Sequence, residues 1–332
     1  MSADKSPQET SKPAARRKLR FWRWLGLLLM LLVLAAAGII WWILPGVHSV
    51  AQDVQLPARF ADGLIYVEPE TLAGTKLSLL ADTGGGLYVT EKAVARTGMQ
   101  PISVFGSKRT RFPAFRTDAW IPEATGAEKW MPVVEQDEDG MVGQRWFAGG
   151  VWTFDYPAQK LIMRHQPFSL ATPEAAHAIP LGFLHEFGVR IGHHPRFTIR
   201  VDGEPIEALL DTGATVRLSP EAMRVIGEPG GPERATSFVS SGIFDNWRKQ
   251  HPEWRVIEKG CELSHQDLIE VPQIEVAGLR AGPVWFTRRG EGNFVWMSSF
   301  MDAPIRASIG GNFFRYFRLT IDYPNAVAYL GR

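Results

Sequence analysis

The chain has 332 residues, enough for two domains of ordinary size, and its 45% hydrophobic and 21% charged content is that of a globular protein. A net charge of +1 gives no reason to expect nucleic acid or another polyanion as a partner. The one cysteine, Cys261, excludes an intrachain disulfide bond and is expected to be a small buried hydrophobic residue.

The N-terminal part of the chain predicts a membrane anchor. Residues 1–24 are basic, and residues 25–44 are uncharged and long enough to cross a hydrocarbon core of about 30 Å as a helix. The positive-inside rule keeps residues 1–24 in the cytoplasm and exports everything after the span. We therefore predict a single-pass protein of the cytoplasmic (inner) membrane whose main domain is periplasmic or otherwise extracytoplasmic. A signal peptide cleaved near residues 35–37 is the alternative, although the apolar run continues to Leu44.

The rest of the chain predicts a mainly β protein with two lobes. Short apolar runs alternate with Gly, Pro and Asp turns, and Phe197, Ile199 and Val201 show the alternation of a half-buried strand. Short helices are expected near residues 91–97 and 220–225. The predicted boundaries are a linker at 45–60, a first lobe at 61–166, an interlobe linker at 167–178 and a second lobe at 179–332 with inserted loops.

A repeat relates the two lobes. An apolar strand runs into Asp-Thr-Gly at Asp82 and again at Asp211, 129 residues later. The segment 142–157 aligns without a gap on the segment 309–324, at an offset of 167 residues. The second copy therefore carries 38 more residues between the two elements. This pattern indicates a duplicated β unit whose copies diverged mainly by loop growth.

Duplicated units tend to pack about a twofold axis, which would bring Asp82 and Asp211 together. Two neighbouring carboxyl groups cannot both ionise comfortably, so they share a proton and titrate as a pair. Such a pair suits peptide hydrolysis, because one carboxylate activates a water while the other carboxyl group protonates the peptide carbonyl oxygen. This chemistry needs no metal or cofactor, and the sequence contains no motif typical of either.

Neighbouring residues have supporting roles in this hypothesis. Threonine hydroxyls would bond across the lobe interface, glycines would let each loop turn sharply, and an apolar-Gly element would pack beneath each loop. The predicted support residues are Thr83, Gly84, Thr212, Gly213, Gly143 and Gly310.

These motifs resemble those of the pepsin and retropepsin clan of aspartic proteases, and the chain is similar to a membrane-anchored bacterial type with both lobes fused. The resemblance implies that Asp82 and Asp211 are catalytic and that Thr83 and Thr212 hold the loops together. It also implies double-psi β-barrel lobes of six strands with pseudo-twofold symmetry, a peptide or protein substrate extended in the cleft, a β-hairpin flap and a monomer.

The chain departs from this family in two places. The family usually has Ser or Thr after Asp-Thr-Gly, whereas this chain has Gly85 and Ala214. Loss of those hydroxyl donors predicts raised apparent pKa values for the pair and an activity optimum less acidic than that of a gastric-type enzyme. Residues 104–108 are the candidate flap, with residues 240–242 as the alternative.

Other functions stay open at this level. The chain is predicted to be an aspartic endopeptidase, and the alternatives are a catalytically inactive peptide-binding or scaffold protein of the same fold and a structural envelope protein. His185, His193 and His194 are expected to be exposed rather than metal ligands, because the spacing of a zinc-binding helix is missing. Asp155 and Asp322, each before Tyr-Pro, are expected to form turns.

Overall fold

The computed structural model describes residues 27–36, 38, 50–124, 129–170 and 177–332, and the chain divides into two units, residues 1–44 and 45–332. In the first unit, residues 27–36 are helical and exposed. No helix among the described residues has the length and apolar character to span a bilayer. Residues 1–24, and residues 25, 26, 37 and 39–44 of the predicted span, lie outside the described residues. The anchor therefore stays a prediction.

The first lobe of the second unit is built on an eight-stranded sheet in the order β2-β3-β4-β9-β5-β8-β7-β6. Its strands are β2 (Ala58–Ala61), β3 (Leu64–Val67), β4 (Leu79–Ala81), β5 (Tyr88–Thr90), β6 (Ile102–Val104), β7 (Ser107–Thr110), β8 (Met131–Val134) and β9 (Gly140–Val142). Helix α2 (Glu91–Thr97) begins where Thr90 caps the Ala93 N–H and ends at Gly98, whose φ of 70° is left-handed.

The second lobe has a nine-stranded sheet in the order β20-β21-β24-β19-β25-β16-β15-β22-β23. Its strands are β15 (Arg196–Val201), β16 (Glu204–Leu210), β19 (Ser237–Ser240), β20 (Val256–Ile257), β21 (Leu268–Val271), β22 (Ile274–Val276), β23 (Leu279–Ala281), β24 (Val284–Arg289) and β25 (Ala307–Ile309). Helix α5 (Pro220–Ile226) repeats the design of α2, with Ser219 as its N-cap and Gly227, at φ 68°, at its end.

The two sheets contain the same arrangement of four strands. In the first lobe β4 is parallel to β9, β9 is antiparallel to β5, and β5 is parallel to β8. In the second lobe β16, β25, β19 and β24 pair in the same senses. The third strand directly follows the Asp-Thr-Gly loop in the first lobe. In the second lobe β17 (Thr215–Arg217), α5 and β18 (Glu233–Ala235) come between the loop and this strand. The repeat read from the sequence is therefore a repeat of structure, altered by insertion.

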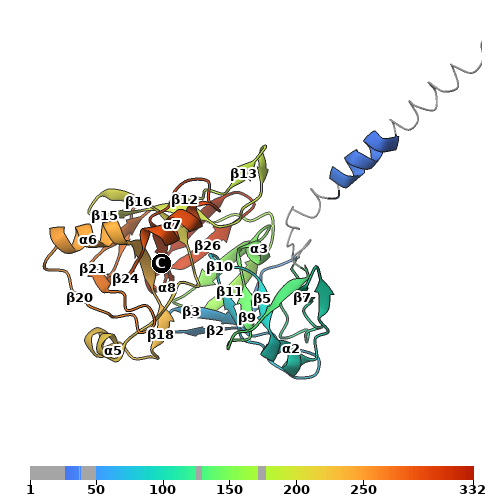
Figure 1. Ribbon diagram of the computed structural model, residues 1–332, viewed down its shortest axis with the longest axis horizontal. Coiled ribbons are helices and arrows are strands. Elements are labelled where there is room, and N and C mark those ends of the chain that lie inside the picture. The colour runs from blue at the N-terminus through green and yellow to red at the C-terminus, as the bar shows by residue number, and fades with distance from the viewer. Residues whose placement is uncertain (1–26, 37, 39–49, 125–128, 171–176) are drawn as a thin grey trace, which may run out of the picture. The chain divides into compact units, whose positions relative to one another are not determined.

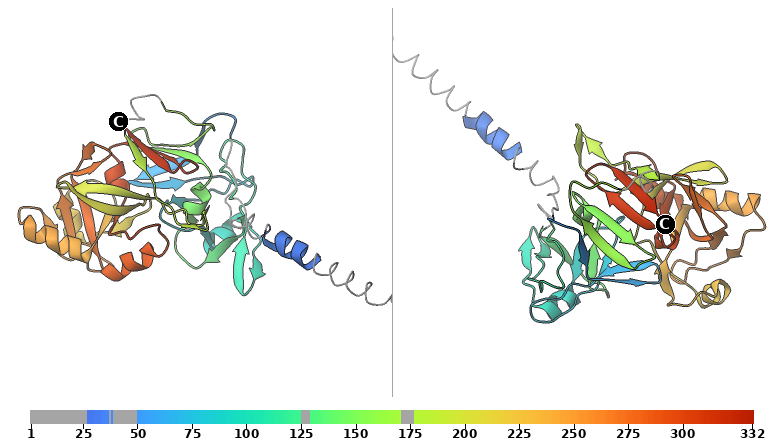
Figure 2. Two further views of the ribbon diagram at one scale, coloured as in Figure 1. Left: turned by 90° about the horizontal axis from the view of Figure 1, so that it is seen from above. Right: turned by 180° about the vertical axis from the view of Figure 1, so that it is seen from behind.

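A third sheet, of order β1-β11-β10-β26-β27-β12, joins the lobes. Its strands are β1 (Val54–Leu56), β10 (Val151–Asp155), β11 (Lys160–Arg164), β12 (Ala178–Pro180), β26 (Arg318–Asp322) and β27 (Val327–Gly331). β10 and β26 are equivalent in the repeat and pair antiparallel, with Thr153 opposite Thr320. The two hydroxyl groups lie 2.8 Å apart in the buried centre of this sheet. The pseudo-twofold axis therefore passes between two copies of the same residue. Strands β10 (green) and β26 (red), which carry them, lie side by side in the ribbon views (Figures 1 and 2).

Aromatic side chains fill the space beneath this joining sheet. Trp146 and Trp152 are fully buried and stack with their ring centroids 4.8 Å apart, while Phe154 and Tyr323 are buried beside them in the same hydrophobic core. Large aromatic rings remove much apolar surface from water, at roughly 25 cal/mol per Å². This burial is available without a disulfide, and Cys261 is free and buried as predicted.

Several boundaries differ from the sequence prediction. The predicted linker 45–60 contains β1 and most of β2, because Val54 and Leu56 alternate with Gln55 and pair with β11. The lobe sheets have eight and nine strands, so the expectation of six was wrong. Residues 171–176 of the interlobe linker lie outside the described residues, and residue 178 already belongs to β12. The insertion forms β20–β23 and two helices, α6 (Ser241–Gln250) and α7 (Glu291–Ser298).

Candidate active site

Two buried strands deliver the two aspartates. β4 ends at Ala81 and β16 at Leu210, and the next residue in each case is the aspartate of the Asp-Thr-Gly loop. The backbone N–H of Asp82 donates to the Val142 carbonyl oxygen and that of Asp211 to the Ile309 carbonyl oxygen, both at 3.0 Å. Each carboxyl group therefore stands on a fixed strand end.

Two threonines lock the loops to each other. The Thr83 hydroxyl donates to the Leu210 carbonyl oxygen and the Thr212 hydroxyl to the Ala81 carbonyl oxygen, both at 2.7 Å. Each hydroxyl also accepts the backbone N–H of the other threonine, at 3.0 and 3.1 Å. Both side chains are fully buried, so these bonds do not compete with water.

The glycines of the two loops lie against the opposite aspartates. A Cβ atom on Gly84 would lie 2.7 Å from the carboxyl carbon of Asp211, and one on Gly213 would overlap the carboxyl group of Asp82. Only glycine leaves room for this crossed arrangement, because any side chain would displace the carboxyl group of the other lobe.

The two aspartates interact directly. Both are buried, at 7% and 8% exposed. Burial raises the pKa of Asp82 well above its ordinary value, and the charge of Asp211 and a side-chain hydrogen bond with Asp211 raise it further. The N–H groups of Gly84 and Gly85 act in the opposite direction, and the Gly84 bond to Asp82 Oδ1 is 2.8 Å long. The pair is therefore expected to keep a shared proton to a higher pH than a lone aspartate would.

The two aspartates differ in one neighbour. Ser308, on β25, donates its hydroxyl to Asp211 Oδ2 at 2.5 Å. In the strand register of the first lobe, the matching place on β9 belongs to Met141, which carries no hydroxyl. The expectation that the pair lacks a hydroxyl donor was therefore wrong for Asp211. The donor comes from the neighbouring strand, not from residue 214.

The two apolar-Gly elements lie beside the loops. A Cβ atom on Gly143 would overlap the carbonyl oxygens of Gly85 and Gly86, and one on Gly310 would overlap the Thr236 carbonyl oxygen. Both glycines have extended backbones, so their small size is required by close approach. The predicted turn residues Asp155 and Asp322 each accept a backbone N–H three residues ahead, at 3.0 Å.

A cleft of about 590 Å³ opens above the aspartates. The floor is formed by the two Asp-Thr-Gly loops, and Met141 and Gln144 line the side of the first lobe. On the side of the second lobe, the lining comes largely from the insertion and includes Phe238, Arg289, Trp296, Met297, Phe300 and Met301. Trp296 and Phe300 are exposed, which places apolar surface at the mouth of the cleft.

The histidine prediction was wrong in part. His185, in the small hairpin of β13 (His185–Glu186) and β14 (Val189–Arg190), is exposed, but His193 is only 1% exposed. Burial, helped by the charges of nearby arginines, lowers the pKa of His193 to about 3. His194 lines the cleft, where burial lowers its pKa against the effect of the Asp211 charge. The loop before β15 therefore carries a neutral imidazole into the cleft.

Neither flap candidate covers the cleft. Residues 104–108 form the turn of the β6–β7 hairpin, and Phe105 at its tip is fully exposed, but no residue of this hairpin lines the cleft. Residues 240–242 are the start of α6, where the Gly242 N–H donates to a Glu291 carboxylate oxygen at 2.7 Å. The second candidate is therefore a helix N-terminus and not a hairpin.

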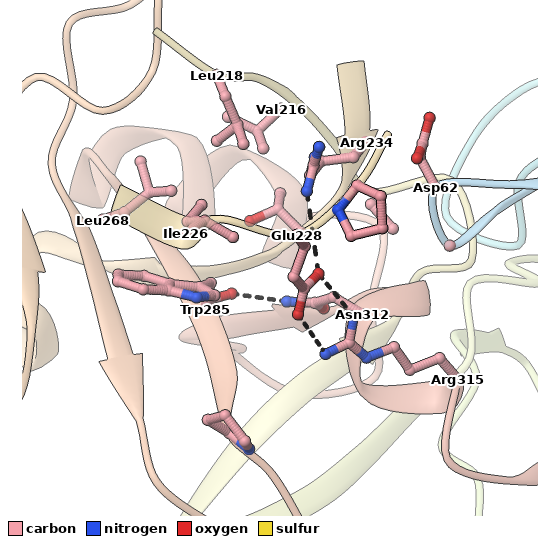
Figure 3. A pocket seen from close by; sticks show the side chains of 15 residues that line it. Asp62, Val216, Leu218, Ile226, Glu228, Arg234, Leu268, Trp285, Asn312 and Arg315 are labelled. Atoms are coloured by element: carbon pink, nitrogen blue, oxygen red, sulfur yellow. Dashed lines mark hydrogen bonds and ion pairs between the residues drawn. The ribbon is translucent and has the colours of Figure 1, made fainter. Parts of the chain in front are cut away.

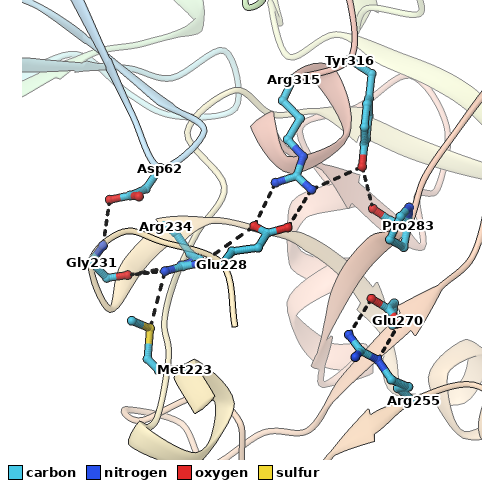
Figure 4. A network of polar contacts seen from close by, with 10 residues as sticks. All are labelled: Asp62, Met223, Glu228, Gly231, Arg234, Arg255, Glu270, Pro283, Arg315 and Tyr316. Atoms are coloured by element: carbon cyan, nitrogen blue, oxygen red, sulfur yellow. Dashed lines mark hydrogen bonds and ion pairs between the residues drawn. The ribbon is translucent and has the colours of Figure 1, made fainter. Parts of the chain in front are cut away.

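A second pocket, of about 140 Å³, lies next to the tip of the β2–β3 hairpin (Figure 3). Within it, Glu228 accepts two hydrogen bonds from Arg315, at 2.9 and 3.0 Å. Arg234 donates to the Gly231 carbonyl oxygen, and Asp62 accepts the Gly231 N–H (Figure 4). The charges that line this pocket are thus paired within the protein, as at a junction between packed segments.

Comparisons with known proteins found structures of similar fold but no similar sequence. No family model matches the chain, and a search of curated proteins gives no match in sequence. Solved structures similar to it include an aspartic proteinase from Irpex lacteus, with 11% identity, 84% of this chain and 97% of that chain covered, and a TM-score of 0.48. Basic 7S globulin from soybean (7%, TM-score 0.41) and conglutin gamma, a basic 7S globulin from lupine seeds (9%, TM-score 0.45), each cover 84% of this chain and 95% of their own.

The class of protein follows from the geometry. Two related β lobes share a joining sheet, and two interlocked Asp-Thr-Gly loops place paired carboxyl groups at the floor of a cleft. This chain has an aspartic-protease-like fold, with paired aspartates at the floor of its cleft. Sequence reasoning missed Ser308, Arg289 and the side of the cleft formed by α7 and the residues after it, which we call the α7 wall (Trp296, Met297, Phe300 and Met301). None of these residues has an equivalent in the first copy of the repeat that would have marked it.

Proposed function

We propose that this protein is a membrane-anchored aspartic endopeptidase, with two double-psi β-barrel lobes, that hydrolyses peptide bonds in the cleft. The observation that carries the proposal is the buried, hydrogen-bonded pair Asp82 and Asp211, fixed by reciprocal threonine bonds at the floor of the cleft. Two buried carboxyl groups in contact lower the stability of the fold. Turns with a purely structural role would not need them, which favours a catalytic role for the pair.

The surroundings of the two carboxyl groups assign their roles. Asp82, whose pKa is raised, holds the shared proton and donates it to the oxygen of the scissile carbonyl group. Asp211 accepts the hydrogen bond of Ser308 and acts as the carboxylate that takes a proton from the attacking water. Water oxygen then bonds to the carbonyl carbon. Collapse of this gem-diol intermediate breaks the C–N bond. The leaving nitrogen takes the proton that Asp211 removed from the water, and one gem-diol hydroxyl returns its proton to Asp82, so the pair regains its starting state.

The apolar wall of the cleft supports a peptide as substrate. Trp296, Met297 and Phe300 present large apolar surfaces beside the aspartates, which suits the side chains of an extended peptide. A peptide-binding protein without turnover is the second candidate. It is favoured by one observation, the absence of a hydroxyl donor to Asp82 where Met141 lies.

Peptide cleavage by the full-length chain in a mild detergent tests the proposal. We expect mass spectrometry of a diverse peptide pool to show internal cleavage, blocked by a statine-type transition-state mimic. Asp82→Asn and Asp211→Asn should each lower the rate roughly a hundredfold or more while the fold persists. Peptide binding without cleavage would favour the second candidate, and cleavage that survives both substitutions would refute the proposed mechanism.

The location is part of the proposal. The uncharged run at residues 25–44 and the basic residues before it support a periplasmic or otherwise extracytoplasmic catalytic domain. Protease treatment of intact spheroplasts should digest residues 45–332 if the domain is outside, and should spare them if it is cytoplasmic.

A further inference from the structure

Arg289 is a cation at the edge of the cleft. It is the last residue of β24 and pairs with Ser240 of the parallel strand β19. Its side chain is half-buried and lines the cleft, with the guanidinium carbon 3.5 Å from the centroid of the Phe238 ring. Stacking on an aromatic face holds a guanidinium group in one orientation without using its N–H donors.

The guanidinium group of Arg289 has no counter-ion within the part of the chain that the structure describes. No carboxylate of those residues lies within ion-pair distance of it, and no hydrogen bond joins it to them. Its neighbour Arg288 donates two hydrogen bonds to Asp245, each of 3.0 Å. In the second pocket, Arg315 is likewise paired with Glu228. Arg289 thus differs from Arg288 and Arg315, whose guanidinium groups are each paired with a carboxylate.

A guanidinium group that is partly buried in a cleft without a counter-ion loses hydration free energy that no ion pair restores. Burial lowers the pKa of Arg289, and the charge of Asp211 offsets this only in part. A charge removed from water is stabilised when a partner of opposite charge supplies hydrogen bonds in good geometry. The free N–H donors of an arginine form a fork that matches a carboxylate.

We propose that Arg289 is a specificity-determining residue that binds a carboxylate of the peptide, carried by an acidic side chain or by a free C-terminus. This inference rests on the proposed function only in taking a peptide as the ligand. The α7 wall adds an apolar requirement, because Trp296 and Phe300 lie in the same cleft. The preferred peptide therefore combines a carboxylate with a large apolar residue near the bond that lies over the aspartates.

Peptide binding tests this inference without relying on turnover. The full-length Asp82→Asn chain is equilibrated with N-acetylated, C-amidated hexapeptide pools that contain one Phe and, at one scanned position, either Glu or Gln. A third set carries Gln and a free C-terminal carboxylate. We expect one carboxylate-bearing set to bind roughly tenfold more tightly than the neutral set, as a charge-assisted hydrogen bond implies. The set that gains identifies the source of the carboxylate.

Variants separate Arg289 from general charge effects. Arg289→Met should remove the advantage, whereas Arg280→Met, an exposed arginine paired with Glu275 away from the cleft, should leave it unchanged. Arg289→Glu should reverse the preference, so that Lys pools bind better than Glu pools. Equal binding of all sets, no binding of any set, or an advantage that survives Arg289→Met would overturn the inference. Cleavage of the same pools by the unsubstituted chain is read separately, so loss of turnover and loss of preference are distinguished.

Discussion

Ser308 donates a 2.5 Å hydrogen bond to Asp211 from the strand that runs parallel to β16. The strand in the matching position of the first lobe presents Met141 to the cleft instead. The pseudo-twofold symmetry of the backbone is therefore broken at the level of a single hydroxyl group. In the proposed mechanism, this asymmetry distinguishes the acid from the base within a pair of identical side chains.

Replacement of this hydroxyl should move the pH profile of cleavage. Ser308→Ala removes a donor to the charged carboxylate, so the acid limb of kcat/KM should shift to higher pH by about one unit. Met141→Ser, which offers a hydroxyl to Asp82, the proposed acid, should instead shift the basic limb to lower pH. Initial rates between acid and neutral pH measure both shifts. A profile unchanged in Ser308→Ala would show that the hydroxyl has no electrostatic role.

The crossed glycines should not tolerate a methyl group. Gly213→Ala places a Cβ atom on the carboxyl group of Asp82, and Gly84→Ala one within 2.7 Å of that of Asp211. Each should lower kcat roughly a hundredfold, because the carboxyl groups are displaced from each other. Gly292→Ala, in the exposed helix α7 with open space around it, is the matched control and should remain active. Full activity of Gly213→Ala would contradict the described geometry.

The threonine pair on the axis should show strong coupling. Thr153→Val leaves the buried hydroxyl of Thr320 without a partner and should cost roughly 1–3 kcal/mol in the free energy of unfolding. The double substitution with Thr320→Val removes both hydroxyl groups and should cost much less than the sum of the single changes. Urea denaturation of the three variants measures this coupling. Additive losses would show that the two hydroxyl groups do not depend on each other.

The catalytic arrangement should reduce stability at neutral pH. The pKa of Asp82 is raised in the folded state, so the folded protein keeps a proton that the unfolded chain has already lost. Stability is then greatest below the unfolded pKa, near 3.9, and falls as pH rises toward the folded value. Asp82→Asn removes this loss and should raise stability at pH 7 by roughly 0.5–2 kcal/mol. Thermal melting of both proteins across pH tests this. If Asp82→Asn loses as much stability between pH 4 and pH 7 as the unsubstituted protein does, the prediction is contradicted.

The sequence was sufficient for features that recur. The repeat placed Asp82 and Asp211 in equivalent loops, and symmetry alone then required them to meet at the axis. The same argument covered Asp155 and Asp322, whose carboxylates form matching turns. Such features were accessible because each copy carries the same residue at the same place.

Features present in one copy only were not accessible. Ser308 reaches Asp211 across 97 residues through a strand register, and its repeat partner is a methionine that gives no hint of a hydroxyl. His193 was expected to be exposed, but the loop before β15 buries its ring, and no pattern in the sequence marked that packing. Strand β1 was read as part of the linker 45–60, because its partner strand β11 lies more than a hundred residues away.

Helix α7 and Arg289 belong to the second repeat alone, so the two sides of the cleft differ in their lining residues. Two identical half-chains would present the same surface to either end of a bound strand and would accept it in both orientations. Here a peptide bound across the axis would contact aromatic side chains and a cation on the second-lobe side. On the first-lobe side it would contact Met141 and Gln144. Fusion of the two lobes in one chain thereby allows the cleft to favour one orientation of a bound peptide. It also allows substitutions on one side of the cleft without the same substitutions on the other.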